Sequence, residues 1–440
     1  MNNSSSPQGW YFSRVIAAII VGAAIITGCG GGVGTGGTGS FSVAKSNLAR
    51  DTSPQVTDAD LAAVTDGTAE FALKVFPLLD TNPGDNTFFS PYSISQAFAL
   101  LAPGARGTTL SQIEQTISFP LPQDRFNPAF NKLNLNLAGK TTGTVLQNGL
   151  QTPKLNNANA VWGQQGFSIL PAYLDPLAVN YGAGLNLVDF MSAPETARQT
   201  INKWVEDQTN NRIQNLIPPD GVTSDTRLVL TNAMWFKANW ASQFPKTGTA
   251  NGSFTNRDGS SSSVPFMSQV FTAPYAQVAG CQAVDIPYAG GELSMLVIMP
   301  TPGSFDAFLS TLSPTVIGDI TSHLAHTGMD FSMPKYTFTR ESPMGAILQS
   351  LGMTDAFAPG RADFSGIDGN RDLFVAAVFH KAFIAVDEEG TEAAAATAIN
   401  VGVTAAPSAN QTVKIDHPFL FLIRDRQTGL ILFMGKVVTL

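Results

Sequence analysis

Side chains that could bind a metal or attack a substrate are few in this 440-residue sequence, and none belongs to a complete catalytic motif. His323 and His326 lie three residues apart and could hold a metal from one helix face, but no cysteine or further histidine accompanies them. Asp368–Asp372 begins like a calcium loop but lacks the later glycine and glutamate, so a turn is the better interpretation. The hydrolase signatures Gly-x-Ser-x-Gly and His-Glu-x-x-His are also missing, as is a phosphate-binding glycine loop before a helix. We therefore expect neither an enzyme nor a bound metal or cofactor.

Cys29 is the one residue whose context predicts chemistry. Arg14 precedes an apolar run, Val15–Ile26, which is too short to cross a bilayer but suits the core of a secretory signal peptide. The run ends in Ile26–Cys29, which resembles the bacterial lipoprotein box. In that motif small residues admit the signal peptidase, and the cysteine thiol accepts a diacylglyceryl group. An ordinary signal peptide with a chance cysteine is the alternative.

The residues after Cys29 predict a tether. Residues 30–40 are almost all glycine, threonine and serine, a composition that behaves as a flexible coil. Two or more acyl chains, as a processed bacterial lipoprotein carries, are enough for stable anchoring. We predict a signal peptide over 1–28, a lipid-anchored flexible tether over 29–55 and one folded domain over 56–440. The domain is expected outside the cytoplasm, anchored at the cell surface or in the periplasm, or secreted.

Composition indicates a globular chain with a large core, since 44% of its residues are hydrophobic and 13% are charged. The net charge of −8 is spread along the chain, and no run of lysine or arginine interleaves with aromatic residues, so a nucleic-acid partner is not expected. Two cysteines cannot make a disulfide framework, and we interpret Cys281 as a small buried apolar residue. No linker divides the folded part, and a monomer is expected.

Hydrophobic periodicity predicts helices early in the chain and strands late. Helices are expected over 61–79, 91–101, 171–180 and 195–211. In the helix over 91–101, Ser90 is the predicted N-cap and Pro91 occupies the first helical position, where a proline is well tolerated. Strands are expected over 158–162, 185–190, 228–237, 283–287, 293–299, 329–338, 374–387, 419–424 and 429–435. This order indicates an α+β fold built around a large sheet.

The segment from Glu388 to Ala398 combines a helical composition with the pattern of a strand. By propensity alone Glu392–Ala398 would be a helix. A predicted strand ends just before it, at Val386, and Gly390 supplies a permissive pivot. If the segment is extended, Glu392 faces one way and small uncharged side chains face the other. These are Thr391, Ala393, Ala395 and Thr397. Such a strand can enter a closely packed sheet, where a bulky or charged residue would not fit.

Seven segments stand out between about residue 61 and the end of the chain: Asn86–Ser95, Leu230–Trp240, Met333–Tyr336, Leu351–Met353, Ala362–Ile367, Asp387–Ala398 and His417–Phe421. Together they resemble the serpin family. Their order and spacing carry the resemblance, and Asp387–Ala398 closely matches the hinge of inhibitory serpins. The resemblance implies a large central sheet with additional sheets, about eight or nine helices and an exposed reactive-centre loop.

The resemblance also implies a mechanism. A protease attacks the loop as a substrate and forms an acyl intermediate, and the cut loop then inserts into the sheet as a new strand and carries the protease along. Serine proteases, and beyond them cysteine proteases, form such an intermediate, whereas metalloproteases and aspartic proteases do not. The alternative is a non-inhibitory serpin that acts as a binding or surface protein, its loop being only a substrate. The hinge of such serpins usually carries charged or bulky replacements, or proline, where this chain has residues 391–396.

Family spacing places the reactive bond in a small and uncharged stretch. Counting forward from Glu388 gives Thr404–Ala405, while counting back from Pro418 gives a bond a few residues later. The alternatives to that bond are Val403, Ala406 and Pro407. Such residues suit the shallow pockets of elastase-like or subtilisin-like proteases and not trypsin-like pockets, which need arginine or lysine.

The resemblance assigns structural roles to other residues. The hinge comprises Glu388, Glu389, Gly390, Thr391, Glu392, Ala393, Ala394, Ala395, Ala396 and Thr397. Residues expected beneath the opening of the main sheet are Ser90, Ser93, Asn232 and His380. Trp240 and Glu388 match the place where insertion begins. We expect His380 to be buried with its hydrogen bonds made. That expectation is structural and functional at once, because the same hydrogen bonds would hold the sheet closed.

Overall fold

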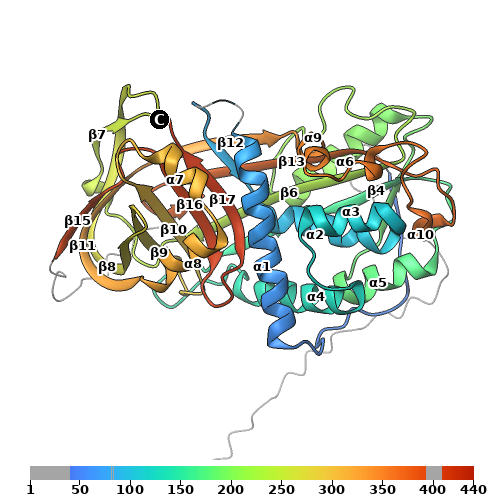
Figure 1. Ribbon diagram of the computed structural model, residues 1–440, viewed down its shortest axis with the longest axis horizontal. Helices are drawn as coiled ribbons and strands as arrows, with labels where there is room; N and C mark the ends of the chain where they lie inside the picture. Colours follow the sequence, from blue (N-terminus) through green and yellow to red (C-terminus); the bar gives the residue numbers. More distant parts are fainter. Residues whose placement is uncertain (1–39, 81, 83, 393–408) are drawn as a thin grey trace, which may run out of the picture.

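Two large β-sheets with helices around them make up the computed structural model, which describes residues 40–80, 82, 84–392 and 409–440 (Figure 1). The predicted signal peptide, Cys29 and the start of the tether lie outside the described residues, as do hinge residues 393–397 and every candidate reactive bond. The α+β class and the large central sheet are confirmed. Among the described residues no helix is long and apolar enough to cross a bilayer.

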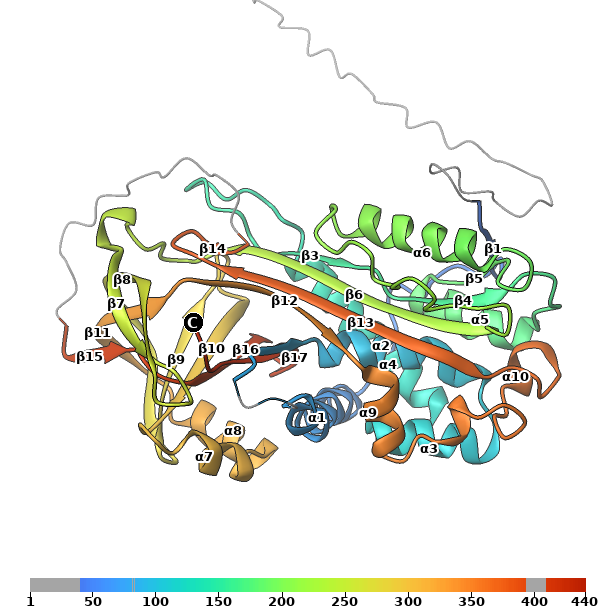
Figure 2. The ribbon, with the colours of Figure 1, turned by 90° about the horizontal axis from the view of Figure 1, so that it is seen from above.

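The first sheet has eight strands and contains the segment of interest. Its order is β1-β5-β4-β6-β14-β13-β12, and β3 pairs with β6 outside this path. The strands are β1 Ser42–Ala44, β3 Lys154–Asn157, β4 Ala160–Gln164, β5 Leu185–Val188, β6 Leu228–Asn239, β12 Tyr336–Ser342, β13 Val375–Val386 and β14 Gly390–Thr391. The long strands β6 and β13 lie in the middle and run parallel to each other (Figure 2).

The second sheet has nine strands in the order β15-β11-β8-β9-β10-β16-β17-β2, with β7 paired to β8. The strands are β2 Thr87–Phe89, β7 Ala250–Thr255, β8 Ser261–Val278, β9 Cys281–Pro287, β10 Leu293–Pro300, β11 Ala325–Pro334, β15 Gln411–Lys414, β16 Phe419–Asp425 and β17 Ile431–Val437. Aromatic rings such as Phe88 and Phe421 stack in the buried layer that this sheet covers. Burial of large aromatic side chains stabilises such a layer.

The single strand predicted over 329–338 is wrong, because the chain there forms two strands in different sheets. β11 ends at Pro334 in the second sheet, and β12 begins at Tyr336 in the first. A proline offers no N–H for a further ladder bond, and at Lys335 the chain passes from one sheet to the other. This crossing ties the two sheets together beside the segment 388–392.

Ten α-helices surround the sheets in the described residues, including short ones that periodicity does not reveal. They are α1 Asp58–Val75, α2 Pro91–Leu101, α3 Gly107–Ile117, α4 Gln123–Lys140, α5 Pro171–Tyr181, α6 Pro194–Gln208, α7 Phe305–Thr311, α8 Pro314–Ser322, α9 Met344–Ser350 and α10 Ser365–Asp368. α6 covers one face of the first sheet, while α1, α2 and α9 lie on the other side (Figure 2). The predicted cap of α2 is confirmed, since Ser90 Oγ accepts a hydrogen bond of 3.1 Å from the Ser93 N–H.

The folded part begins before residue 56, so the predicted boundary of the tether is wrong. β1 pairs with β5 and becomes the edge strand of the first sheet. Phe41 packs edge-to-face against Trp162, with ring centroids 5.3 Å apart. Farther along, Arg50 donates hydrogen bonds to the Asn131 side chain of α4. Composition shows neither the backbone pairing of β1 nor the burial of Phe41, so the predicted tether was extended through residues 41–55.

Candidate functional site

The strand β14 lies between β6 and β13 at one end of the first sheet. Gly390 pairs with Asn239 and Thr391 with Ala238 on β6, while Thr391 also faces Val386 on β13. β6 and β13 pair directly from Leu228 and Val375 as far as Met234 and Ala382. The sheet is therefore closed along most of these two strands, and the start of the predicted hinge already occupies the gap between their far ends.

Gly390 and Thr391 fit this gap closely. A Cβ built on Gly390 would lie 1.9 Å from the carbonyl oxygen of Ala238, so no larger residue can hold this position without moving β6. The Thr391 side chain is 2% exposed, and its hydroxyl lies 2.7 Å from the Tyr288 hydroxyl. A charged side chain in place of Thr391 would lose its hydration without a compensating partner.

Glu392 points the other way, as the alternation of a strand predicts. Its N–H donates to the Ala385 carbonyl at 2.6 Å, and its carboxylate pairs with Arg212, which follows α6 on the outer face of the sheet, at 2.5 Å. Glu392 has a positive φ of 47°, so the chain turns out of the strand at this residue. Burial raises the pKa of the Glu392 carboxyl to about 7 against the opposing effect of Arg212.

Glu388 is anchored at the turn that precedes β14. Its two carboxylate oxygens accept hydrogen bonds of 2.7 Å from Lys335 Nζ and from the Thr249 hydroxyl. Burial alone would raise the pKa of Glu388, but these bonds outweigh it and hold the pKa below its usual value. Lys335 is the residue at which the chain passes between the sheets, so this ion pair joins the hinge to that crossing.

Trp240 fixes the same turn from the end of β6. Its indole Nε1–H donates to the Asp387 carbonyl and its backbone N–H to the Glu389 carbonyl, both at 2.9 Å. The ring stacks on Tyr288 with centroids 4.8 Å apart and is fully buried. Trp240 and Glu388, which the resemblance places where insertion begins, thus lie at the same turn, and the direct bonds of Trp240 go to the neighbours of Glu388.

A buried hydrogen-bond chain crosses the seam where β6 and β13 pair. His380 of β13 lies in register with Asn232 of β6, and its Nδ1 hydrogen-bonds the Asn232 side-chain oxygen. The Ser90 backbone N–H donates to His380 Nε2 at 3.3 Å. Asn232 in turn donates to Asn159 Oδ1 at 3.0 Å, and the Ser93 hydroxyl donates to the same oxygen at 2.8 Å. The four residues predicted to lie beneath the sheet opening are therefore brought together.

The chain of bonds requires a neutral His380. Because Nε2 accepts from Ser90, the proton sits on Nδ1 and points at Asn232. The ring is 2% exposed, and burial lowers the pKa of His380 to about 3. Separating β6 from β13 at this level would break the Asn232–His380 bond inside the protein.

Several residues of the site escaped the sequence analysis. Asn159, which accepts from both Asn232 and Ser93, lies in the strand predicted over 158–162, where no local signal marks it as a buried hydrogen-bond partner. Tyr288, Lys335 and Thr249 contact the hinge from positions next to strand ends, where no local signal marks their partners. Only their position in the folded chain identifies them, because each lies more than 50 residues from its hinge partner.

The other candidates remain apart from this site. His323 caps α8 and His326 lies in β11, so the two histidines do not share a helix face, and both are exposed. Among the described residues no cluster of three or more histidine, cysteine or acidic residues could hold a metal. Asp368 accepts a hydrogen bond of 2.8 Å from the Asn370 N–H, which agrees with a turn. Cys281 is buried as predicted, and burial raises the pKa of its thiol to about 11.

Comparison with known proteins identifies relatives of the whole folded part. The family described as "Serpin (serine protease inhibitor)" matches residues 66–440. An uncharacterised serpin-like protein of Thermococcus kodakarensis is 38% identical over 357 residues, which cover 80% of each chain. The human leukocyte elastase inhibitor is 36% identical over 380 residues, 83% of this chain and 96% of that protein. The native structure of the thermophilic serpin tengpin is 28% identical with a TM-score of 0.76, covering 90% of this chain and 98% of that one.

Proposed function

The chain belongs to the serpin family, and on that basis we propose that it is a single-use inhibitor of proteases that form an acyl intermediate. The observation that carries the proposal is β14: the hinge is already threaded between β6 and β13 by two residues. Residues 393–397, which follow, are small and uncharged wherever the strand pattern turns them inward. A loop cut by a protease would extend β14 along the same gap.

Insertion of the loop would replace the hydrogen-bond ladder between β6 and β13 by two ladders, one on each side of the new strand. It would separate the direct pairs between β6 and β13, including Asn232 with His380, and would give each strand a new neighbour in the loop. Each broken pair between β6 and β13 would be replaced by two backbone pairings with the inserted loop. The protease would meanwhile stay attached through an ester, or through a thioester for a cysteine protease. Strong stabilisation on insertion would carry the protease to the opposite end of the sheet before the acyl bond is hydrolysed.

The target class we propose is elastase-like or subtilisin-like serine proteases. Support comes from the small uncharged residues over 403–407 and from the name of the human relative, a leukocyte elastase inhibitor. Thr404–Ala405 is the proposed reactive bond. Cysteine proteases remain a second class, because they also pass through an acyl-enzyme.

The location we propose is outside the cytoplasm, with the serpin domain held to a membrane by lipid on Cys29. The apolar run before that cysteine supports export, and the glycine-rich residues after it support a tether. Metabolic labelling with a radioactive fatty acid should mark the wild-type protein and not Cys29→Ser. Equal labelling of both would reject the anchor without touching the inhibitory proposal.

The inhibitory proposal is tested by incubation with elastase and subtilisin, followed by denaturing electrophoresis. We expect a covalent complex that survives SDS, and mass spectrometry of that complex gives the reactive bond. A matched pair of variants then separates insertion from cleavage. Ala395→Arg places a charge on the same strand face as buried Thr391 and should convert the protein to a substrate, whereas Ala394→Arg places it on the opposite face and should retain complex formation.

Cleavage of the loop without any stable complex, by proteases of both classes, would reject inhibition and favour a serpin that only binds at a surface. Equal complex formation by Ala395→Arg and Ala394→Arg would reject insertion through the hinge face inferred here.

A further inference from the structure

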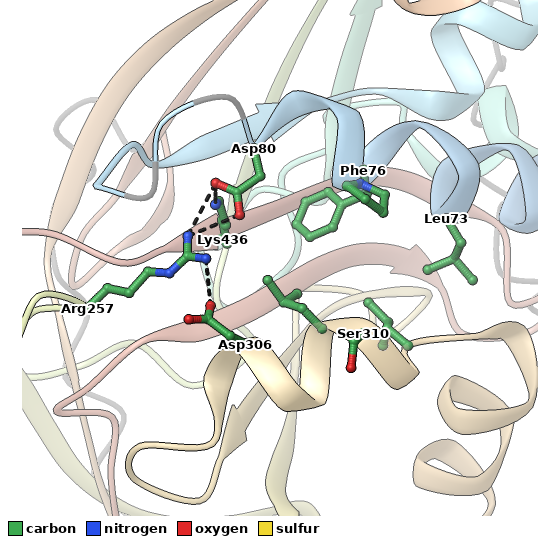
Figure 3. Close-up of a pocket in the computed structure, with 10 residues that line it drawn as sticks. Leu73, Phe76, Asp80, Arg257, Asp306, Ser310 and Lys436 are labelled. Carbon is green, nitrogen blue, oxygen red and sulfur yellow. Dashed lines mark hydrogen bonds and ion pairs between the residues drawn. The ribbon is translucent and has the colours of Figure 1, made fainter. Parts of the chain in front are cut away.

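A cavity of about 340 Å³ lies between the end of α1, helix α7 and strand β17, and its lining among the described residues includes no hinge or seam residue (Figure 3). The charged groups around it pair with one another. Asp80 pairs with both Arg257 and Lys436, and Asp306 pairs with Arg257 from the other side of the guanidinium (Figure 3). These ion pairs connect α7 and β17 to the end of the short helix Phe76–Leu79, so we interpret the cluster as structural.

The β-hairpin over residues 141–153, in contrast, lies next to the hinge. It connects α4 to β3, and backbone hydrogen bonds join its two arms, such as that of 2.9 Å from the Thr152 N–H to the Thr144 carbonyl. Its chain reverses at Gly149, which has a positive φ of 78°. Because β3 pairs with β6 as far as Lys237, the hairpin before it meets the end of β6 on the edge opposite to β14.

Asn239, the last residue of β6, joins the hairpin to the hinge. Its side-chain Oδ1 accepts a hydrogen bond of 2.8 Å from the Gln151 N–H, and its own backbone N–H donates to the Gln151 carbonyl at 3.4 Å. Its Nδ2 donates to the Glu389 carbonyl at 3.3 Å. Only this orientation of the amide satisfies both partners, since one is a donor and the other an acceptor. Asn239 is 5% exposed and thus connects the two edges of the strand from inside the protein.

The Glu389 carbonyl is the point at which the hinge is held. It also accepts hydrogen bonds from the Trp240 N–H at 2.9 Å and from Gln243 Nε2 at 3.1 Å. Gly390, the next residue, pairs with Asn239 and begins β14. Of the three donors to this carbonyl, Asn239 is the one that the hairpin orients. Together the three donors fix the residue from which an inserting loop has to continue.

The register at this point decides which face of the loop would be buried. Thr391 pairs with Ala238, whose side chain belongs to the buried inner face of β6. Continued along β6, the same register would bring the small residues of the hinge opposite further buried positions, namely Ala393 opposite Phe236, Ala395 opposite Met234 and Thr397 opposite Asn232. A slip by one residue would instead turn Glu392 to the inner face, where its carboxylate would be desolvated.

We propose that Asn239, oriented by the hairpin 141–153, is a positioning residue that sets the register in which the cut loop enters the sheet. The role rests on the proposed inhibitory function, because it concerns the insertion step. An acyl intermediate traps the protease only if insertion is faster than hydrolysis. A loop that enters out of register loses time, so the protease is released and the inhibitor is consumed as a substrate.

The test measures the ratio of loop-cleaved protein to SDS-stable complex after incubation of the full chain with elastase. Asn239→Asp keeps the acceptor for the Gln151 N–H but replaces the donor to Glu389 by an oxygen. We expect the ratio to rise about twofold to tenfold, the range that loss of one hydrogen bond spans. Asn156→Asp is the matched control, because it loses an equivalent bond, from Nδ2 to the Gln208 carbonyl at 3.0 Å, away from the hinge. Its ratio should equal that of the wild type.

Gln151→Pro tests the hairpin and keeps the proposal falsifiable if Asn239→Asp does not fold. It removes the N–H that orients Asn239 and leaves the Asn239 side chain intact, so the ratio should rise in the same direction. An unchanged ratio in either variant, or an equal rise in Asn156→Asp, would overturn the positioning role while leaving inhibition by the wild type in place. Failure of the wild type to form any complex would reject the proposed function, and the positioning role with it.

Discussion

Acid should weaken this protein through His380 in a way that a single substitution can isolate. The imidazole is neutral in the folded state, with its pKa lowered by burial to about 3 from the ordinary 6.5. In the unfolded chain it takes up a proton as soon as the pH falls below its ordinary pKa. The stabilising contribution of the neutral ring is therefore complete above pH 6.5 and is lost progressively as the pH falls toward 3.

The magnitude at pH 5 follows from linkage. The unfolded histidine is almost fully protonated there and the folded one is not, so the free energy of unfolding falls by about 2 kcal/mol between pH 7 and pH 5. The result does not depend on the exact folded pKa, because any value well below 5 gives the same loss.

The assay is urea unfolding followed by tryptophan fluorescence, at pH 7 and pH 5, for the wild type and His380→Gln. Carboxylates titrate alike in both proteins, and their contributions cancel in the difference. We expect the wild type to lose about 2 kcal/mol more than His380→Gln over this range. An equal loss in the two proteins would refute the inference that the seam holds a neutral, desolvated histidine.

Further outcomes are expected at the hinge and seam. Lys335→Met should lower the free energy of unfolding by about 1–3 kcal/mol, because buried Glu388 loses its cation, and the double variant with Glu388→Gln should recover part of that loss in the same urea assay. If the double variant recovers none of the lost stability, the effect of Lys335→Met does not come from the unpaired Glu388 carboxylate. Asn159→Ala should cost about 1–3 kcal/mol by leaving the Asn232 amide and the Ser93 hydroxyl without their acceptor, more than the edge-strand control Asn156→Ala. The free energy of unfolding of the wild type should decline as the pH rises from 5 to 8, and Glu392→Gln should remove this decline. The carboxyl of Glu392 ionises above its ordinary pKa of 4.5 in the unfolded chain but only near pH 7 in the folded one. A wild-type profile as flat as that of the variant over this pH range would contradict the prediction.

Local signals decided the parts of the fold that the sequence predicted well. The bounds of α2 were predicted as Pro91–Leu101, and its start is set locally, because the cap at Ser90 and the proline at the first position act within a few residues. The alternation from Thr391 predicted that Thr391 and Glu392 face opposite sides of the sheet, and the contacts of Thr391 with Tyr288 and of Glu392 with Arg212 agree. The α+β class was predicted in the same way, because the periodicity that marks each helix or strand acts within that element.

Tertiary structure alone decided the partners. Nothing near Lys335 announces that the chain changes sheets there, or that its ammonium meets Glu388, 53 residues away. Residues 42–44 form an edge strand only because β5 offers an unpaired edge, and Asn159 gains its role only where β6 and α2 meet. Capping, turns and strand alternation are set by neighbouring residues, so the sequence displays them. Strand neighbours, ion pairs and buried hydrogen-bond chains depend on which distant surfaces the whole chain brings into contact, and that is settled only when the core packs.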